Sequence, residues 1–136
     1  MRIHNRKWWM WQPAWVTMAP DGHIWFHPNG ELFSDDFTRE PIWVQAHFVH
    51  EMTHVWQHQQ GIDLRRKRPP FARYRYLPLT PGKPFHRYGI EQQAEIIRDY
   101  WLLKRGVRLE GRPPLSTYRA LIPFVQEKSE HTPSVA

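Results

Sequence analysis

Apolar residues recur every three or four positions in the stretch that starts at Ile42, which is the period of an α-helix. Thr38 can serve as the N-cap of this helix, because its hydroxyl can accept a hydrogen bond from a free backbone N–H. Gly61 is a natural C-cap, since glycine adopts the left-handed conformation that often ends a helix. The pattern therefore predicts a helix over residues 41–60.

A second helical pattern covers residues 88–105 and is closed by Gly106. Its apolar stripe consists of Ile90, Ala94, Ile97 and Trp101. A third helix is expected over residues 116–128, kinked or interrupted at Pro123, because proline lacks the N–H that the helix ladder needs. Residues 129–136 are expected to form a flexible tail.

The first third of the chain, residues 1–33, has the short aromatic and β-branched runs of strands. Runs at 14–19 and 23–27 are separated by Pro20-Asp21-Gly22, a turn signal, so we expect a small antiparallel hairpin or sheet. Residues 62–87 form a basic loop with one short strand near 73–77. A length of 136 residues favours a single domain. The predicted fold is α+β, with the small sheet packed on the two helices.

Composition narrows the chemistry. The chain has 40% hydrophobic and 24% charged residues, which is typical of a globular protein, and no cysteine, which excludes disulfides and thiolate-bound metals. Its net charge of +6 favours an anionic partner or surface without naming one.

Gln12 and Pro13 interrupt the apolar part of the N-terminus, which therefore lacks the continuous apolar region of a signal peptide. No stretch approaches a membrane span. We expect synthesis in the cytoplasm.

The clearest candidate for a functional motif is His50-Glu51-Met52-Thr53-His54, an H-E-x-x-H sequence inside the first predicted helix. Residues four apart lie one turn apart on the same helix face, so His50 and His54 can bind one ion. Glu51 points towards the same pocket and can take a proton from a water molecule whose pKa the metal has lowered. Apolar neighbours and the absence of proline or glycine in the motif favour this interpretation over a chance pattern on an exposed face.

A catalytic zinc site needs a third protein ligand. Glu91 and Glu95 lie one turn apart on the second predicted helix and share a face, so the residues alone allow either. Ala94 is small enough to let the two helices approach closely, as a shared metal requires. Without a metal, the same carboxylates would be solvated groups on an ordinary amphipathic helix.

The segment from His50 to Gln57, HEMTHVWQ, resembles the active-site helix of zincin metallopeptidases, especially small gluzincin-like domains of bacterial toxins and contractile secretion systems. Those families pair the motif with a later E-x-x-A-D or E-x-x-A-N helix. Residues 91–95 match that pattern with glutamate in the last place, so the resemblance implies Glu91 as zinc ligand and Glu95 as a residue that orients a histidine. In a thermolysin-like E-x-x-x-D register, Glu95 would be the ligand and Asp99 its neighbour.

The resemblance implies a zinc-dependent peptidase in which His50, His54 and Glu91 hold Zn²⁺ and Glu51 is the catalytic base. A peptide or protein substrate, a possible carrier protein of a secretion system and export through such a system follow from the same resemblance. Two alternatives stay open. One is a zinc-binding accessory domain without activity, and the other is a basic module for nucleic acid or an anionic surface. The absence of RRM, OB or zinc-finger signatures argues against nucleic acid.

Hydrolysis also needs a donor for the developing oxyanion. The candidates lie in or near the basic loop: Tyr74, Tyr76, His86 and Tyr88. The basic run at 65–68 and the arginines at 73, 75 and 87 are expected to rim the cleft. His58 is expected to lie one turn beyond the metal and to take a surface position.

Overall fold

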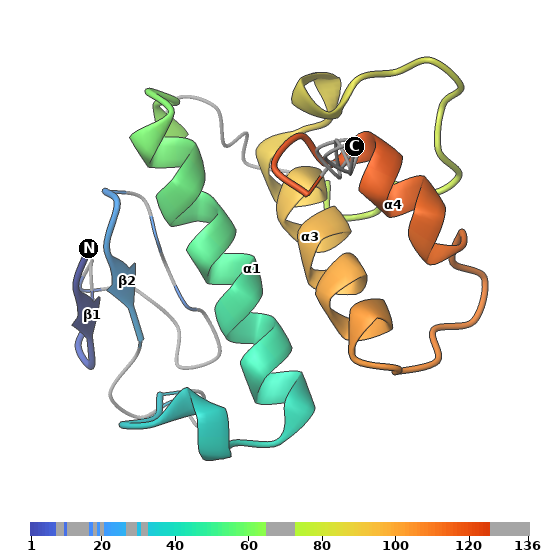
Figure 1. The fold of residues 1–136 in the computed structure, drawn as a ribbon. Coiled ribbons are helices and arrows are strands. Elements are labelled where there is room, and N and C mark those ends of the chain that lie inside the picture. The colour runs from blue at the N-terminus through green and yellow to red at the C-terminus, as the bar shows by residue number, and fades with distance from the viewer. Residues whose placement is uncertain are drawn as a thin grey trace, which may run out of the picture.

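The computed structural model describes residues 1–7, 10, 17, 19, 21–26, 30, 33–64 and 73–125. A long central helix, α1, has a two-stranded sheet on one side and two further helices on the other (Figure 1). This arrangement confirms the predicted α+β class. The elements in chain order are β1 (Ile3–His4), β2 (Ile24–Trp25), the 3-10 turn η1 (Phe37–Arg39), α1 (Ile42–Gln59), the 3-10 turn η2 (Phe85–Arg87), α3 (Ile90–Lys104) and α4 (Leu115–Leu121).

The small sheet is parallel, so the predicted antiparallel hairpin is wrong. β2 lies within the expected second strand, but it pairs with the N-terminus, with Ile3 opposite Ile24. Hydrogen bonds within the segment 21–25 stabilise the turn locally: the carboxylate of Asp21 accepts from the backbone N–H of His23 and from the indole N–H of Trp25. Parallel strands need a long crossover, which the chain between β1 and β2 supplies. Most of the expected first strand, at 14–19, lies outside the described residues.

Helix α1 begins one residue after the predicted start. Its N-cap is Pro41 rather than Thr38, because Thr38 lies inside the preceding turn η1, where its N–H donates to Asp36. The C-terminal prediction is confirmed: Gly61 has a φ of +84°, and Ile62 donates back to the carbonyl of Gln57 over 3.2 Å.

The segment before α3 has no strand in its described part, so the strand predicted near 73–77 is wrong. A side chain takes the place of a strand partner there: the Gln92 amide donates to the backbone carbonyl of Arg75 over 2.8 Å. Helix α3 starts two residues later than predicted, after η2. Helix α4, expected over 116–128 with a kink or interruption at Pro123, ends at Leu121 and does not resume at residues 124–125, and residues 126–128 lie outside the described part of the chain. The expected tail, 129–136, lies outside the described residues. In the described part of the chain no helix is both long and apolar enough to span a membrane.

Helix α1 is covered on two sides by separate apolar clusters. One joins it to α3, α4 and the segment before α3, with a core of Tyr76, Phe85, Tyr88, Ile96, Ile97, Tyr100, Tyr118 and Ile122. The other joins it to the sheet side, with a core of Ala19, Ile24, Phe26 and Val55. Because both flanks of α1 are packed, polar side chains on the face that meets α3 are removed from water, and this is where the histidines of the motif lie.

Candidate metal centre

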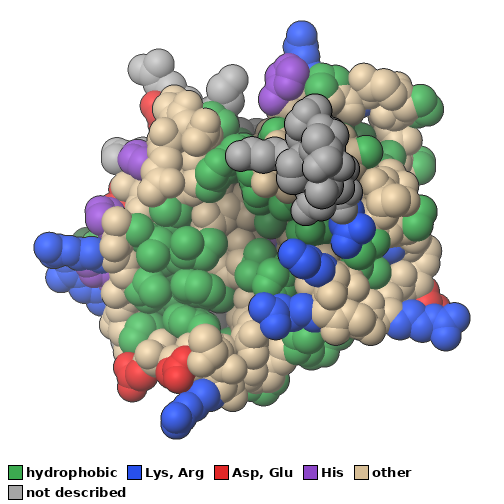
Figure 2. All heavy atoms as spheres, viewed as in Figure 1, with side chains coloured by type: hydrophobic (Ala, Val, Ile, Leu, Met, Phe, Trp, Pro, Cys, Tyr) green, Lys and Arg blue, Asp and Glu red, His purple; other side chains and the backbone are tan. Residues whose placement is uncertain are grey.

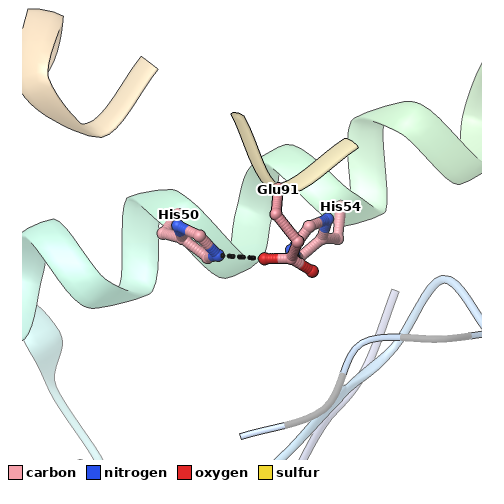
Figure 3. A group of neighbouring side chains, drawn as sticks. All are labelled: His50, His54 and Glu91. Atoms are coloured by element: carbon pink, nitrogen blue, oxygen red, sulfur yellow. Dashed lines mark hydrogen bonds and ion pairs between the residues drawn. The ribbon is translucent and has the colours of Figure 1, made fainter. Parts of the chain in front are cut away.

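The motif residues lie on one buried stretch of α1. His50 and His54 are one turn apart and each is 6% exposed, and Glu51 is 5% exposed. In Figure 3 the two imidazoles leave the same face of the helix and point towards Glu91, which reaches between them from the first turn of α3. The structure thus brings together, from two helices, the three side chains that the sequence analysis proposed as ligands.

One carboxylate faces both imidazoles. Glu91 Oε2 lies 3.1 Å from His50 Nε2, and Glu91 Oε1 lies 3.2 Å from His54 Nε2. One ligand atom from each of the three residues can be chosen so that all lie within 4.8 Å of one another. Tetrahedral zinc with ligands at about 2.1 Å needs ligand atoms roughly 3.4 Å apart. The spacing and the two-imidazole, one-carboxylate donor set therefore fit a metal ion such as zinc.

Without a metal ion, the contacts within this cluster favour the charged forms of His50, His54 and Glu91. Burial by itself lowers the pKa of His50, but hydrogen bonds to Glu91 and Glu95 outweigh it and raise that pKa to about 10. His54 follows the same balance and its pKa is also raised, chiefly by Glu91 against burial. Burial would raise the pKa of Glu91, but its bonds to the two imidazoles lower it. An ion of charge +2 would replace the imidazole protons in balancing this carboxylate.

The two registers considered for the third ligand differ in the structure. Glu95 does not reach the space between the imidazoles; its Oε1 lies 3.5 Å from Nδ1 of His50, on the far side of that ring. Asp99 is 1% exposed and turns to Tyr76 and Arg112 instead, with Arg112 Nε donating to it over 2.8 Å. The geometry favours Glu91 between the two rings and Glu95 behind one of them.

Glu51 has a histidine neighbour that sequence reasoning did not single out. His47 lies one turn earlier on α1, with its Nε2 3.8 Å from Glu51 Oε1 and 2.9 Å from the Thr17 hydroxyl. Burial is the main cause that lowers the pKa of His47 to about 4, and the charge of His50 is the second. His47 is therefore neutral at pH 7 and does not form an ion pair with Glu51. The signal in the sequence is its spacing, three residues before His50.

The four candidate oxyanion donors differ in their hydrogen bonds, in their burial and in how near they lie to the metal ligands. Tyr76 donates its hydroxyl proton to Asp99, and Tyr88 is buried and accepts from the backbone N–H of Thr80. His86 is exposed on η2. The ring of Tyr74 lies near the metal ligands: its centroid is 6.1 Å from that of His50, the planes are 21° apart, and the side chain is 43% exposed.

A buried amide network was also missed. Gln57 ends the motif segment, and no role for it was predicted from the sequence. The structure places its side chain against His54 Nδ1, with an oxygen–nitrogen distance of 2.8 Å and no exposed area. The available signal was again spacing, because a residue three positions after His54 shares its helix face. His58, one turn further on, is exposed as expected, and its ring packs against Gly22.

Basic residues occur on several segments of the chain. Arg73, Arg75 and Arg87 are exposed, and the run at 65–68 lies outside the described residues. On the face in Figure 2, Lys and Arg side chains stand at separate places around the outline and to the right of the centre, and hydrophobic side chains gather over and beside α1.

The chain is similar to a protein of a bacterial secretion system. The chain is 40% identical over 114 residues to the type VI secretion system spike protein VgrG2b of Pseudomonas aeruginosa, a match that covers 76% of this chain and 11% of the relative. The solved structure of the effector domain of Pseudomonas aeruginosa VgrG2b superposes with a TM-score of 0.62 at 34% identity, covering 76% of this chain and 61% of that one. No protein-family model matches the chain.

These identities exceed what a shared fold alone produces, so the chain is homologous to the effector domain of that spike protein. The chain spans about a tenth of the length of the whole spike protein.

Proposed function

We propose that this protein is a zinc-dependent peptidase that acts as an effector of a type VI secretion system. The observation that carries the enzymatic part is the single buried carboxylate of Glu91, which faces Nε2 of both His50 and His54 beside the glutamate of an H-E-x-x-H motif. The homology of this chain to the effector domain of VgrG2b supports the biological part. The substrate is proposed to be a peptide or protein, since amide hydrolysis is the chemistry that the resemblance to zincins implies.

In the proposed mechanism, His50, His54 and Glu91 hold the zinc ion. Zinc, when bound, lowers the pKa of water and polarises a carbonyl oxygen. Glu51 takes the proton of the attacking water on a carboxylate oxygen and returns it to the leaving amine. Burial of Glu51 supports this role, because bulk water competes little for its carboxylate. Glu95 donates no ligand; it accepts from Nδ1 of His50 and orients that ring.

The zinc content of purified variants tests the site directly. Wild type is expected to hold about one zinc per chain, and His54→Ala and Glu91→Ala are expected to hold almost none, because two protein ligands do not retain zinc through purification. Glu95→Ala removes the carboxylate behind His50 and not a proposed ligand, so it is expected to weaken zinc affinity but to keep about one zinc per chain when zinc is supplied. Elemental analysis measures all four.

Zinc retained by Glu91→Ala and lost by Glu95→Ala would replace Glu91 by Glu95 as ligand. A wild type that binds no zinc when zinc is supplied would overturn the enzyme proposal as a whole.

Tyr74 is proposed as the oxyanion donor, because its ring lies beside His50 and its side chain reaches solvent. Tyr74→Phe is expected to lower kcat about 100-fold, as loss of one oxyanion donor does, with KM and zinc content nearly unchanged. Steady-state kinetics on a labelled unfolded protein measure this. Tyr88→Phe serves as control, since that hydroxyl accepts from Thr80 N–H, and it is expected to keep kcat. An equal loss of kcat in both variants would contradict the assignment.

A further inference from the structure

Beyond the three ligands, we infer that Gln57 and Gln93 form a positioning relay that holds His54 with its proton on Nδ1 and its Nε2 lone pair turned towards the metal position. This inference rests on the proposed zinc site. Four hydrogen bonds carry it, of which two join α1 to the start of α3 and one lies within each of these segments. Both glutamine side chains are buried, at 0% and 4% exposure.

The direction of the relay is set by two backbone carbonyls, which can only accept hydrogen bonds. Gln93 Nε2 lies 2.8 Å from the carbonyl oxygen of Tyr88, and Gln57 Nε2 lies 2.9 Å from that of Ile90. Each of these contacts requires the amide NH₂ group at that end. Neither side chain can be turned round without placing two acceptors against each other, so the amide orientations follow from the backbone.

The proton of His54 follows from the same reasoning. With both amides oriented, Gln93 Oε1 accepts from Gln57 Nε2 over 2.9 Å, and Gln57 Oε1 faces His54 Nδ1 over 2.8 Å. An amide oxygen has no proton to give, so His54 Nδ1 must carry the hydrogen. In the neutral imidazole the lone pair is then on Nε2, the atom that faces Glu91.

The relay also ties the two halves of the site together. Tyr88 and Ile90 flank Gly89, the N-cap of α3, and Ile90 directly precedes Glu91. The backbone that positions the third ligand therefore also sets the tautomer of the second. His50 differs, because a carboxylate, Glu95, lies behind its Nδ1. One histidine is held by an ionic partner and the other by a neutral amide.

Zinc affinity of three variants tests the relay. Gln57→Leu keeps most of the volume but has no acceptor, and is expected to weaken the zinc Kd about 10- to 100-fold, as loss of such an orienting partner does. Gln57→Glu keeps an acceptor for Nδ1–H, and burial beside two further acceptors favours its protonated form, whose hydroxyl can donate in place of the amide NH₂. This variant is expected to keep the Kd within about threefold of wild type. Gln59→Leu, the same substitution at an exposed position of α1, is the matched control and should leave the Kd unchanged. Competition with a chromogenic chelator measures the Kd.

A packing role for Gln57 predicts the opposite order, because leucine suits a buried site better than glutamate. Long-range ¹H–¹⁵N correlation of the His54 ring in the zinc-loaded protein adds a second readout. Wild type and Gln57→Glu should show a protonated Nδ1 and a metal-bound Nε2, and Gln57→Leu should lose the hydrogen-bonded Nδ1 proton signal.

The outcomes separate the two proposals. Wild-type zinc binding together with an unchanged Kd and ring spectrum in Gln57→Leu overturns the relay and leaves the metal site standing. A Gln57→Glu variant weaker than Gln57→Leu also overturns it. If Gln57→Leu does not fold, Gln57→Glu decides alone, and a loss of tenfold or more counts against the relay. A wild type without zinc overturns both proposals.

Discussion

Glu51→Gln is expected to keep one zinc per chain and to lose about 1,000-fold in kcat. The substitution preserves the size and burial of the side chain but removes its ability to accept a proton, and general acid–base catalysis contributes about 10²- to 10⁴-fold. The three proposed ligands are untouched, so metal binding is expected to stay. Elemental analysis and hydrolysis of labelled casein by the same preparations measure the two effects.

Glu110→Gln is the control, since it makes the same substitution at an exposed carboxylate outside the site. Its kcat is expected to equal that of wild type. A Glu51→Gln variant that kept more than a tenth of the wild-type kcat would refute Glu51 as the base. A wild type that binds zinc and cleaves no peptide or protein would instead favour an accessory domain that has a metal but no turnover.

Asp99→Ala is expected to destabilise the fold by about 3 kcal/mol without removing zinc. Asp99 is fully buried and accepts from Tyr76 and Arg112, and Tyr118 must in turn donate to the Tyr76 oxygen, whose own proton goes to Asp99. Burial, helped by the bond to Asp99, raises the pKa of Tyr76 well above its usual value. Deletion of the carboxylate leaves buried polar groups without a partner, and hydrogen bonds to charged groups contribute roughly 1.5–3 kcal/mol each.

Urea denaturation at constant zinc measures this loss as a lower midpoint with an unchanged m-value. Arg112→Gln should cost about 1 kcal/mol or less, because the arginine side chain is 35% exposed and water replaces part of its contact. Glu110→Ala, at an exposed position, should be close to neutral. Loss of zinc from Asp99→Ala in a folded protein would revive the register that places Asp99 next to the metal.

Local patterns were sufficient for the helices. The period of apolar residues located α1 and α3 to within two residues, and the glycines at 61 and 106 marked their ends, with φ values of +84° and +83°. These features depend on backbone hydrogen bonds between near neighbours, so they can be predicted without knowledge of the fold. The same locality explains the motif, because the two histidines share a face on any helix that contains them.

Strand pairing was not predictable in this way. A turn signal at residues 20–22 suggested that its two flanks pair, but β2 pairs with the N-terminus, some twenty residues away. The pairing of β2 depends on which distant backbone groups meet, and on the hydrogen bond that the Trp25 indole donates to Asp21. The strand expected near 73–77 was wrong for a related reason, since a glutamine of α3 occupies a backbone carbonyl there.

The sequence by itself determined the chemistry available to this protein: two imidazoles and a glutamate on one helix, and a second helix with carboxylates one turn apart. Only the tertiary structure decided which carboxylate lies between the imidazoles. The rotation of α3 about its own axis and its position along α1 place Glu91 next to both rings and Asp99 next to Tyr76. The glutamine relay likewise depends on contacts across the helix pair. Sequence spacing sets the face of a helix, but packing sets what that face meets.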